Sequence, residues 1–262
     1  MMMHTAWRFL DTGMESGAWN MAVDELFLED FKEGDMPIIR VYGWENTLSL
    51  GRFSPSSKNL HHENIQAKNI PLVRRMSGGG ILIHGGDLSY TLIMPRMRGR
   101  GVKENYRYVC GFLISLYQKM GHEAQFACDL HLNEQRSSIC LAGIEPYDIV
   151  IEGKKMGGNA QRYTRHAVFQ HGSIPMRIDE SFFKPLFLED SGLDRAATLE
   201  KLGTPISYEE LCALFRESFC ETFAVELMSD FLTVSQEQRA TQLSMEKYTQ
   251  ESWNLHGKNT HS

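Results

Sequence analysis

The residues best suited to covalent chemistry are a cysteine, Cys140, and a lysine fifteen positions later, Lys155. A thiol becomes an effective nucleophile when a nearby cation lowers its pKa, and a lysine ammonium can be that cation. Cys140 lies in the polar stretch NEQRSSIC, in which no helix or strand is predicted. If this stretch adjoins EGKKM in the fold, the two side chains form a nucleophile and its electrostatic partner. The alternative is an inert buried thiol, because cysteine is among the residues most often buried.

The other four cysteines are predicted to be structural. Cys110, Cys212 and Cys220 lie on apolar helical faces, and Cys128 alternates with its neighbours in a predicted strand. No two cysteines have the spacing of a zinc finger or a redox CxxC pair, and five is an odd number. We therefore predict reduced thiols, no disulfide framework and no metal site, as is typical of a cytoplasmic protein.

A glycine-rich segment, RRMSGGGILIHGGD at positions 74–87, is a second candidate site. Three consecutive glycines permit positive φ and let a ligand touch backbone N–H groups, and two arginines can bind a carboxylate or phosphate. The segment is not a P-loop, because GxxxxGK[ST] is absent and a strand follows the glycines. The equally open alternative is a hairpin turn with its arginines on a solvated face. The candidate binding residues are Arg74, Arg75, Ser77, Gly78, Gly79, Gly80 and His84.

Two lysines precede small residues in GKKMGGNAQ, at positions 153–161. A hairpin lysine can place an ammonium beside a carbonyl or phosphate while the backbone of small residues comes close. Adjacent strand positions face opposite sides, so only one of the two lysines, Lys154 or Lys155, can face the site. A lysine-tipped surface hairpin is the alternative. The further candidate binding residues are Gly157, Gly158, Asn159, Ala160 and, in QHGS, His171.

The elements that must position these residues do not follow a regular βαβ alternation. Apolar residues at helical spacing predict helices at about 18–31 and 103–120, and strand-like runs joined by tight turns lie between and after them. A capping box, Ser207 with Glu210, begins a helix in the last third. We therefore predict an α+β fold with a mixed, largely antiparallel sheet and flanking helices. It forms a single domain over 1–262, with a small helical C-terminal part at about 200–250.

Charge and sequence pattern argue against two classes of partner, nucleic acids and membranes. The 262 residues carry a net charge of −6, which disfavours a nucleic-acid binder. No apolar run approaches the length that spans a bilayer, and the N-terminus has no signal-peptide pattern, so no membrane partner is predicted.

One run is basic, and we interpret it either as a solvated loop or as a docking patch for an acidic partner. It consists of Arg96, Arg98, Arg100, Lys103 and Arg107.

Taken together and in this order, the segments resemble the lipoate and octanoate transfer family, which shares its fold with biotin protein ligases. The resemblance covers nearly the whole chain. It implies a mixed sheet flanked by helices, an acyl chain in a tunnel beside the glycine-rich segment, and Lys155 directed at the acyl carbonyl. The matching segments are WRFLDTG, AWNMAVDE, IIRVYGW, TLSLGRF, VRRMSGGGILIHGGDLSYT, RSSICLAGIEPYDIVIEGKKMGGNAQ, VFQHGSI and KYTQESWN.

RSSIC resembles the octanoyltransferase branch of this family. That branch implies transfer of octanoyl from octanoyl–acyl carrier protein, through a thioester on Cys140, to a lysine of a lipoyl domain or of glycine-cleavage H protein. It requires no cofactor. One alternative is an ATP-dependent lipoate–protein ligase, which uses ATP and Mg²⁺ and forms lipoyl-AMP; many such ligases carry an accessory domain for which this chain lacks length. The other is a non-catalytic protein that binds acyl groups or lipoyl domains.

Two positions depart from the family pattern. Many relatives have an acidic residue after the histidine of the glycine-rich segment, where this chain has Gly85, and a serine is usual at Asn159.

Overall fold

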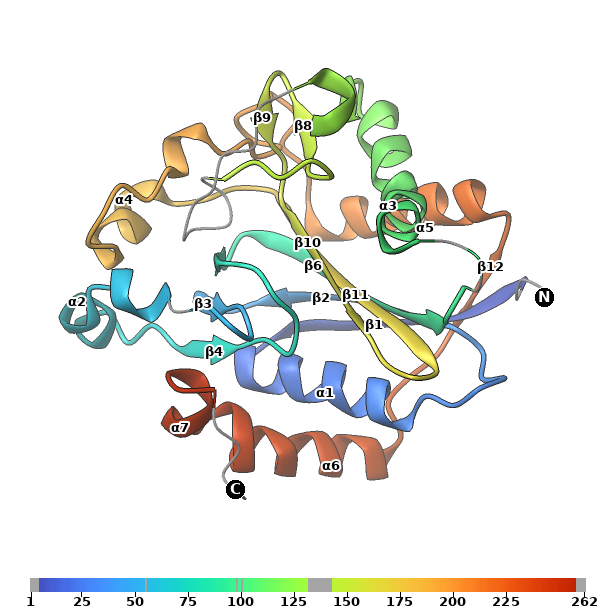
Figure 1. Cartoon of the computed structure of the whole chain (residues 1–262), viewed down its shortest axis with the longest axis horizontal. Helices are drawn as coiled ribbons and strands as arrows, with labels where there is room; N and C mark the ends of the chain where they lie inside the picture. Colours follow the sequence, from blue (N-terminus) through green and yellow to red (C-terminus); the bar gives the residue numbers. More distant parts are fainter. Residues whose placement is uncertain (1–4, 55, 98, 100, 132–142, 258–262) are drawn as a thin grey trace.

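The computed structural model describes residues 5–54, 56–97, 99, 101–131 and 143–257. Its centre is a mixed six-stranded sheet (Figure 1). Strand β1 pairs in parallel with both of its neighbours, and the other ladders of this sheet are antiparallel. In spatial order the strands are β10 (Gly158–Tyr163), β11 (Ala167–Pro175), β6 (Asp87–Pro95), β2 (Ile38–Trp44), β1 (Ala6–Glu15) and β12 (Glu226–Ser229).

Four helices cover the two faces of this sheet (Figure 1). Helices α1 (Gly17–Asp30) and α6 (Val234–Leu243) lie on one face, and α3 (Val102–Lys119) and α5 (Tyr208–Phe223) lie on the other. The predicted capping box begins α5, because the Ser207 hydroxyl accepts from the Glu210 N–H and the Glu210 carboxylate accepts from the Ser207 N–H. The fold class predicted from the sequence is thus confirmed.

Side chains of the central strands point alternately to the two faces of the sheet and so pack into both layers of the core. In β2, Ile39 and Val41 pack in the cluster under α3 and α5, whereas Ile38 and Tyr42 pack in the cluster under α1. Side chains of a strand point alternately to its two faces, so a central strand covered on both faces reads as a continuous apolar run. This burial fixes the register of the sheet and of the polar residues that interrupt it.

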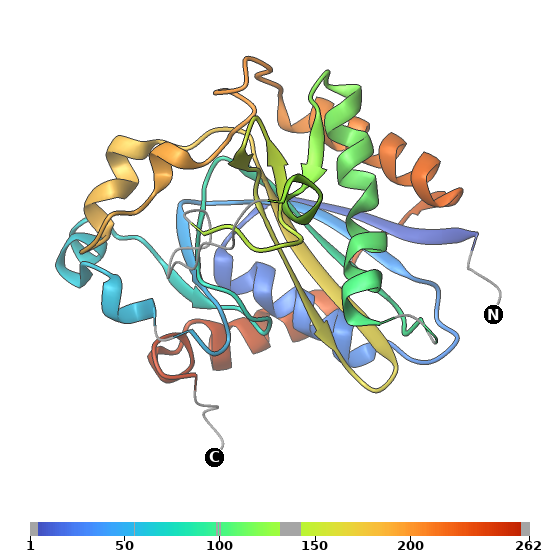
Figure 2. The same cartoon turned by 45° about the horizontal axis from the view of Figure 1, so that its top comes forward.

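Two small sheets flank the large one. Figures 1 and 2 place the first near the short helices α2 and α4, and the second beside α3. The first consists of β4 (Leu72–Arg74), β3 (Thr47–Leu50) and β5 (Ile81–His84), the second of β7 (Ala124–Phe126), β8 (Ile149–Ile151) and β9 (Lys154–Lys155). The short helices are α2 (His62–Ala67), α4 (Glu180–Phe183), α7 (Glu251–Asn254), 3-10 turns at Ser56–Asn59, Ala127–Leu130, Lys184–Leu186 and Leu193–Arg195, and a π-helical turn at Ser244–Tyr248.

The plain hairpin interpretation of the glycine-rich segment is wrong. Strands β4 and β5, which flank the glycines, do not pair with each other, because β3 lies between them. β4 pairs with β3 in parallel and β5 pairs with it antiparallel. The three glycines therefore cross the end of β3 from one of its edges to the other.

The C-terminal part is divided between both faces of the sheet. Helix α5 packs on α3, β12 joins the sheet at β1, and α6 packs on α1. Cys128 lies in a 3-10 turn and not in the predicted strand, because β7 ends at Phe126. Among the described residues, no helix combines the length and apolar composition that crossing a bilayer requires.

Candidate active site

A cavity of about 1290 Å³ brings together most of the residues predicted to form the site. Its lining comes from the glycine-rich segment, the β8–β9 hairpin, the start of β10 and the middle of β11. Cys140 lies outside the described residues, so its approach to Lys155 stays a prediction. The predicted residues that line the cavity are Arg75, Gly78, Gly79, Gly80, His84, Lys155, Gly158, Asn159, Ala160 and His171.

Lys155 is a buried cation in the cavity wall. Its Nζ lies 2.7 Å from Oδ2 of Asp148, and both side chains are almost inaccessible to solvent. The Glu145 N–H also donates to this carboxylate oxygen. Burial raises the pKa of the Asp148 carboxyl above its ordinary value, and the Lys155 ammonium and the Glu145 N–H oppose that rise. Lys154 is exposed on the opposite side of β9, as the alternation of the hairpin predicts.

Arg75 holds the backbone of the three glycines in place. Its guanidinium donates to the carbonyl oxygens of Gly78 and Gly80 at 3.3 and 3.0 Å, and to the carbonyl of Ser49 at 2.7 Å. Gly79 has a φ of +103°, which disfavours any residue with a side chain. The arginine therefore shapes the glycine segment from within the protein as well as lining the cavity.

His84 has both ring nitrogens bonded within the protein. Nδ1 lies 2.9 Å from Oδ2 of Asp87, and Nε2 shares a 2.7 Å hydrogen bond with the hydroxyl of Ser49. The ring stacks on Trp44 with centroids 3.9 Å apart. These contacts fix the orientation of the His84 ring. Because both ring nitrogens are bonded within the protein, the ring offers carbon atoms to the cavity.

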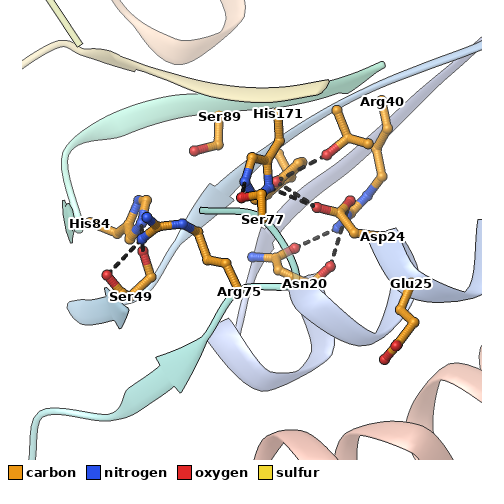
Figure 3. A network of polar contacts seen from close by, with 12 residues as sticks. Asn20, Asp24, Glu25, Arg40, Ser49, Arg75, Ser77, His84, Ser89 and His171 are labelled. Atoms are coloured by element: carbon orange, nitrogen blue, oxygen red, sulfur yellow. Dashed lines mark hydrogen bonds and ion pairs between the residues drawn. The ribbon is translucent and has the colours of Figure 1, made fainter. Parts of the chain in front are cut away.

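His171 is the centre of a second polar chain (Figure 3). Its Nε2 shares a hydrogen bond with the hydroxyl of Ser77, and its Nδ1 lies 3.6 Å from Oδ2 of Asp24. Asp24 is held by Nη1 of Arg40 at 2.9 Å, and both of these side chains are fully buried. This chain ties β11 and the glycine segment to α1 and β2.

The two chains, Ser49–His84–Asp87 and Ser77–His171–Asp24, have the composition of a hydrolase triad. A serine nucleophile must reach its substrate. Ser49 and Ser77 are buried and neither lines the cavity, whereas both histidines do. The arrangement is therefore suited to fixing the cavity wall and not to serine catalysis. In the described residues, no cluster of three side chains is suited to holding a metal ion.

The protein-family model for the lipoyl protein ligase A/B catalytic domain matches the sequence over residues 16–220, well over half of the chain. The chain belongs to the lipoyl protein ligase A/B family. It is 35% identical over 270 residues to an octanoyltransferase LipM of Kyrpidia tusciae, covering 95% of this chain and 98% of that protein. It is 31% identical over 276 residues to the octanoyltransferase LipM of Bacillus subtilis, covering 97% and 99%.

Solved structures of lipoate–protein ligases have the same fold. A lipoate–protein ligase A bound with ATP superimposes with a TM-score of 0.82 at 22% identity, covering 95% of this chain and 98% of that one. The bipartite lipoate protein ligase of Thermoplasma acidophilum gives 0.81 at 21% identity, covering 96% and 97%. At these identities the likeness establishes the fold alone.

Both positions that depart from the pattern of the lipoyl ligase A/B family lie near the cavity wall. Beside Gly85, His84 has a carboxylate partner in Asp87, three residues after it. Burial opposes ionisation of Asp87, yet His84 and the hydroxyls of Ser173 and Ser89 hold its pKa below the ordinary value. Asn159 lines the cavity and accepts from the hydroxyl of Tyr90 at 2.7 Å through its side-chain oxygen.

Three residues predicted to bind substrate do not line the cavity. The prediction for Arg74 is corrected, because its guanidinium donates to backbone carbonyls of the segments around Gly51 and Leu255 and Arg74 does not line the cavity. Ser77 binds His171 from behind the wall. Gly157 has a φ of +74°, and an added Cβ would lie 2.0 Å from the carbonyl oxygen of Ser173. Their roles are to shape the wall.

Sequence reasoning missed the carboxylates that position the site. Asp148 precedes the apolar run of β8 on the hairpin of Lys155, a placement that was visible in DIVIEGKK. Asp87 was visible in the glycine-rich segment. Asp24 gave no signal, because it lies on α1 and meets His171 only through tertiary packing.

The predicted basic run is only partly described. Arg98 and Arg100 lie outside the described residues. Lys103 lines the cavity, Arg96 lies over the ring of Tyr163, and Arg107 is paired with Asp129. The docking hypothesis for this run stays a prediction.

Replacing His171 by asparagine is expected to flatten the pH dependence of stability. Burial lowers the pKa of His171 from its ordinary value, with Asp24 opposing the shift and Arg75 and His84 adding to it. As pH falls through the ordinary histidine range, the unfolded chain takes up a proton at this site before the folded chain does, so stability falls with pH. Urea unfolding at about pH 7.5 and about pH 5.5 measures the difference. Equal differences for the wild type and His171→Asn would contradict this assignment.

Proposed function

We propose that this protein is an octanoyltransferase of lipoate biosynthesis. It moves an octanoyl group from octanoyl–acyl carrier protein, through a thioester on Cys140, to a lysine of a lipoyl domain or of glycine-cleavage H protein. The observation that carries the proposal is the identity of 35% and 31%, over nearly the full length, to octanoyltransferases of Kyrpidia tusciae and Bacillus subtilis.

The cavity is suited to an acyl chain with a reacting carbonyl at one end. Aromatic and aliphatic side chains, among them Tyr42, Trp44 and Leu82, contribute to its lining. The polar atoms of His84 are bonded inside the protein, so that part of the wall offers carbon to the ligand. Lys155 is a buried cation of the same wall. Gly143, three residues after Cys140 in the sequence, also lines the cavity.

In the first step, the Cys140 thiolate attacks the carbonyl carbon of the donor thioester. A bond forms between Sγ and that carbon, the bond to the donor sulfur breaks, and the released thiolate takes up a proton. Negative charge develops on the carbonyl oxygen in the transition state, where the Lys155 ammonium stabilises it. The ion pair with Asp148 keeps that ammonium in one position, which saves reorganisation during the reaction.

In the second step, the neutral amine of the target lysine attacks the thioester on Cys140. The amide bond forms, the bond to Sγ breaks, the cysteine thiolate is restored, and the amine loses one proton to solvent. Both steps use an acyl group that is already activated as a thioester, so the transfer consumes no ATP. Division of one transfer into two thiol-mediated steps is ordinary covalent catalysis.

The test compares two donors with an unmodified lipoyl domain as acceptor. Octanoyl–acyl carrier protein without ATP is expected to modify the acceptor by one octanoyl group in intact-mass analysis. Free octanoate or lipoate with ATP and Mg²⁺ is expected to give no modification. Modification only in the second arm would overturn the proposal and place the protein among the ligases. Binding of acyl groups without modification in either arm would indicate a non-catalytic member.

Substitutions in the glycine segment are expected to separate acyl binding from folding. A Cβ added at Gly78 meets no atom within 4 Å, so Gly78→Ala should leave the melting temperature unchanged. Because Gly78 lines the cavity, the same change should raise KM for an octanoyl thioester about fivefold. Gly79→Ala must adopt a φ of +103° and should lower the free energy of unfolding by about 1–2 kcal/mol. Equal effects of the two variants on stability would contradict this description.

A further inference from the structure

The segment KYTQESWN is part of the family resemblance, yet none of its residues lines the cavity. It lies in the C-terminal segment, residues 244–257, which comprises the π-helical turn, α7 and the residues that follow. Lys247 Nζ contacts both carboxylate oxygens of Glu25 on α1, at 2.6 and 2.7 Å, and the hydroxyl of Tyr248 donates to the same carboxylate. The first half of the segment is thereby attached to α1.

The second half of the segment is attached to Arg74, at the end of β4. The indole N–H of Trp253 donates to the carbonyl of Arg74 at 2.9 Å, and the side-chain oxygen of Asn254 accepts from the N–H of Arg74 at 2.9 Å. In return the guanidinium donates to the carbonyls of Trp253, Asn254 and Leu255 at 3.1, 3.1 and 2.9 Å. These carbonyls are at the C-terminal end of α7, where positive charge is favoured. The Trp253 carbonyl also accepts from the N–H of Gly257 at 2.8 Å.

Arg74 also holds the residues that follow β3. Its Nη1 donates to the carbonyl of Gly51 at 2.7 Å. Arg52 is attached to the C-terminal segment independently, because its Nη1 donates to the carbonyl of Gly257 at 2.9 Å and its guanidinium lies over the ring of Trp253. Two arginines, Arg74 and Arg52, thus connect positions 51–52 to the C-terminal segment.

Positions 51–52 in turn support the glycine segment. The N–H of Gly51 donates to the carbonyl of Gly80 at 3.1 Å, and the N–H of Arg52 donates to the carbonyl of Ser77 at 2.7 Å. The two backbones are too close for a side chain at position 51, since a Cβ on Gly51 would lie 1.9 Å from the carbonyl oxygen of Gly79. A continuous series of hydrogen bonds therefore runs from α7 to the wall of the cavity.

From this series we infer that Trp253 and Asn254 are positioning residues for the acyl-binding wall, acting through Arg74 and residues 51–52 on the glycine segment. The arginine adjacent to Arg75 thereby has a defined role that needs no contact with substrate. The kinetic part of the test rests on the proposed function, whereas its hydrogen-exchange part does not.

The test uses Trp253→Phe in the full chain. This change keeps an aromatic ring beside Arg52 and Lys247. It removes the indole N–H that donates to Arg74, together with the rest of the five-membered ring. The matched control is Arg239→Gln, which removes a bidentate ion pair between α6 and Asp30 of α1 without touching Arg74. Amide exchange is followed by mass spectrometry in peptides that cover residues 49–54 and 74–82, with the melting temperature measured in parallel.

Trp253→Phe is expected to speed exchange in these peptides about tenfold, as loss of one buried hydrogen bond allows. KM for the octanoyl donor should rise severalfold with little change in kcat, because the wall binds substrate and transition state alike. Arg239→Gln should change neither. Faster exchange confined to residues 244–257 would overturn the inference and leave the segment a plain packing element. If the wild type transfers no octanoyl group, the proposed function fails, while exchange still decides the positioning role.

Discussion

Replacing Cys140 by serine is expected to abolish octanoyl transfer. A serine hydroxyl has no comparable anion at neutral pH, so the loss should be roughly a thousandfold or more. After mixing with octanoyl–acyl carrier protein without ATP, the wild type should gain one octanoyl group in its intact mass. Neutral hydroxylamine should remove that group, and a lipoyl domain should accept it. Cys140→Ser should show neither loading nor transfer.

The described cysteines provide the matched controls for this experiment. Burial raises the pKa of the Cys110 and Cys212 thiols to about 12, so neither is an available thiolate near neutrality. Cys110→Ala and Cys212→Ala should therefore retain loading and lower only stability, by about 1–3 kcal/mol. Full activity of Cys140→Ser, with a requirement for ATP and free acid in the wild type, would make the thiol incidental and the ligase alternative correct.

Replacing Lys155 by alanine is expected to have the second-largest effect, a loss of roughly a hundredfold to a thousandfold in kcat/KM. The substitution also leaves the buried carboxylate of Asp148 without its cation, which lowers stability. The double variant Lys155→Ala with Asp148→Asn removes that unpaired charge. It should regain much of the lost free energy of unfolding and none of the activity. Steady-state kinetics and urea unfolding of the two variants separate the catalytic contribution from the structural one.

The neighbouring lysine, Lys154, is the control for the assignment of Lys155 to the site. Lys154 is exposed on the other side of β9, and Lys154→Ala should change kcat/KM by less than about twofold. A larger loss for Lys154→Ala than for Lys155→Ala would show that the wrong lysine has been assigned. If the double variant regained activity together with stability, Lys155 would be a structural partner of Asp148 only.

The sequence by itself determined the features that depend on local pattern. Helical periodicity placed α1 and α3, and the capping box of Ser207 with Glu210 placed the start of α5. Alternation placed Lys154 and Lys155 on opposite sides of their strand, and the family resemblance selected Lys155. Motifs that occur in the same order along nearly the whole chain indicated the family. Ten of the predicted site residues line one cavity.

Only the tertiary structure decided which neighbour each of these residues has. Arg74 and Arg75 are indistinguishable in the sequence, yet Arg75 lines the cavity whereas Arg74 binds residues about 180 positions away. The glycine segment is not a hairpin, because β3 comes from an earlier part of the chain and inserts between the strands that the segment joins. The partners of His171 and Lys155 follow from packing in the same way. A local pattern records the face on which a residue is buried, whereas the identity of its partner depends on how distant elements pack, and no spacing in the sequence encodes that.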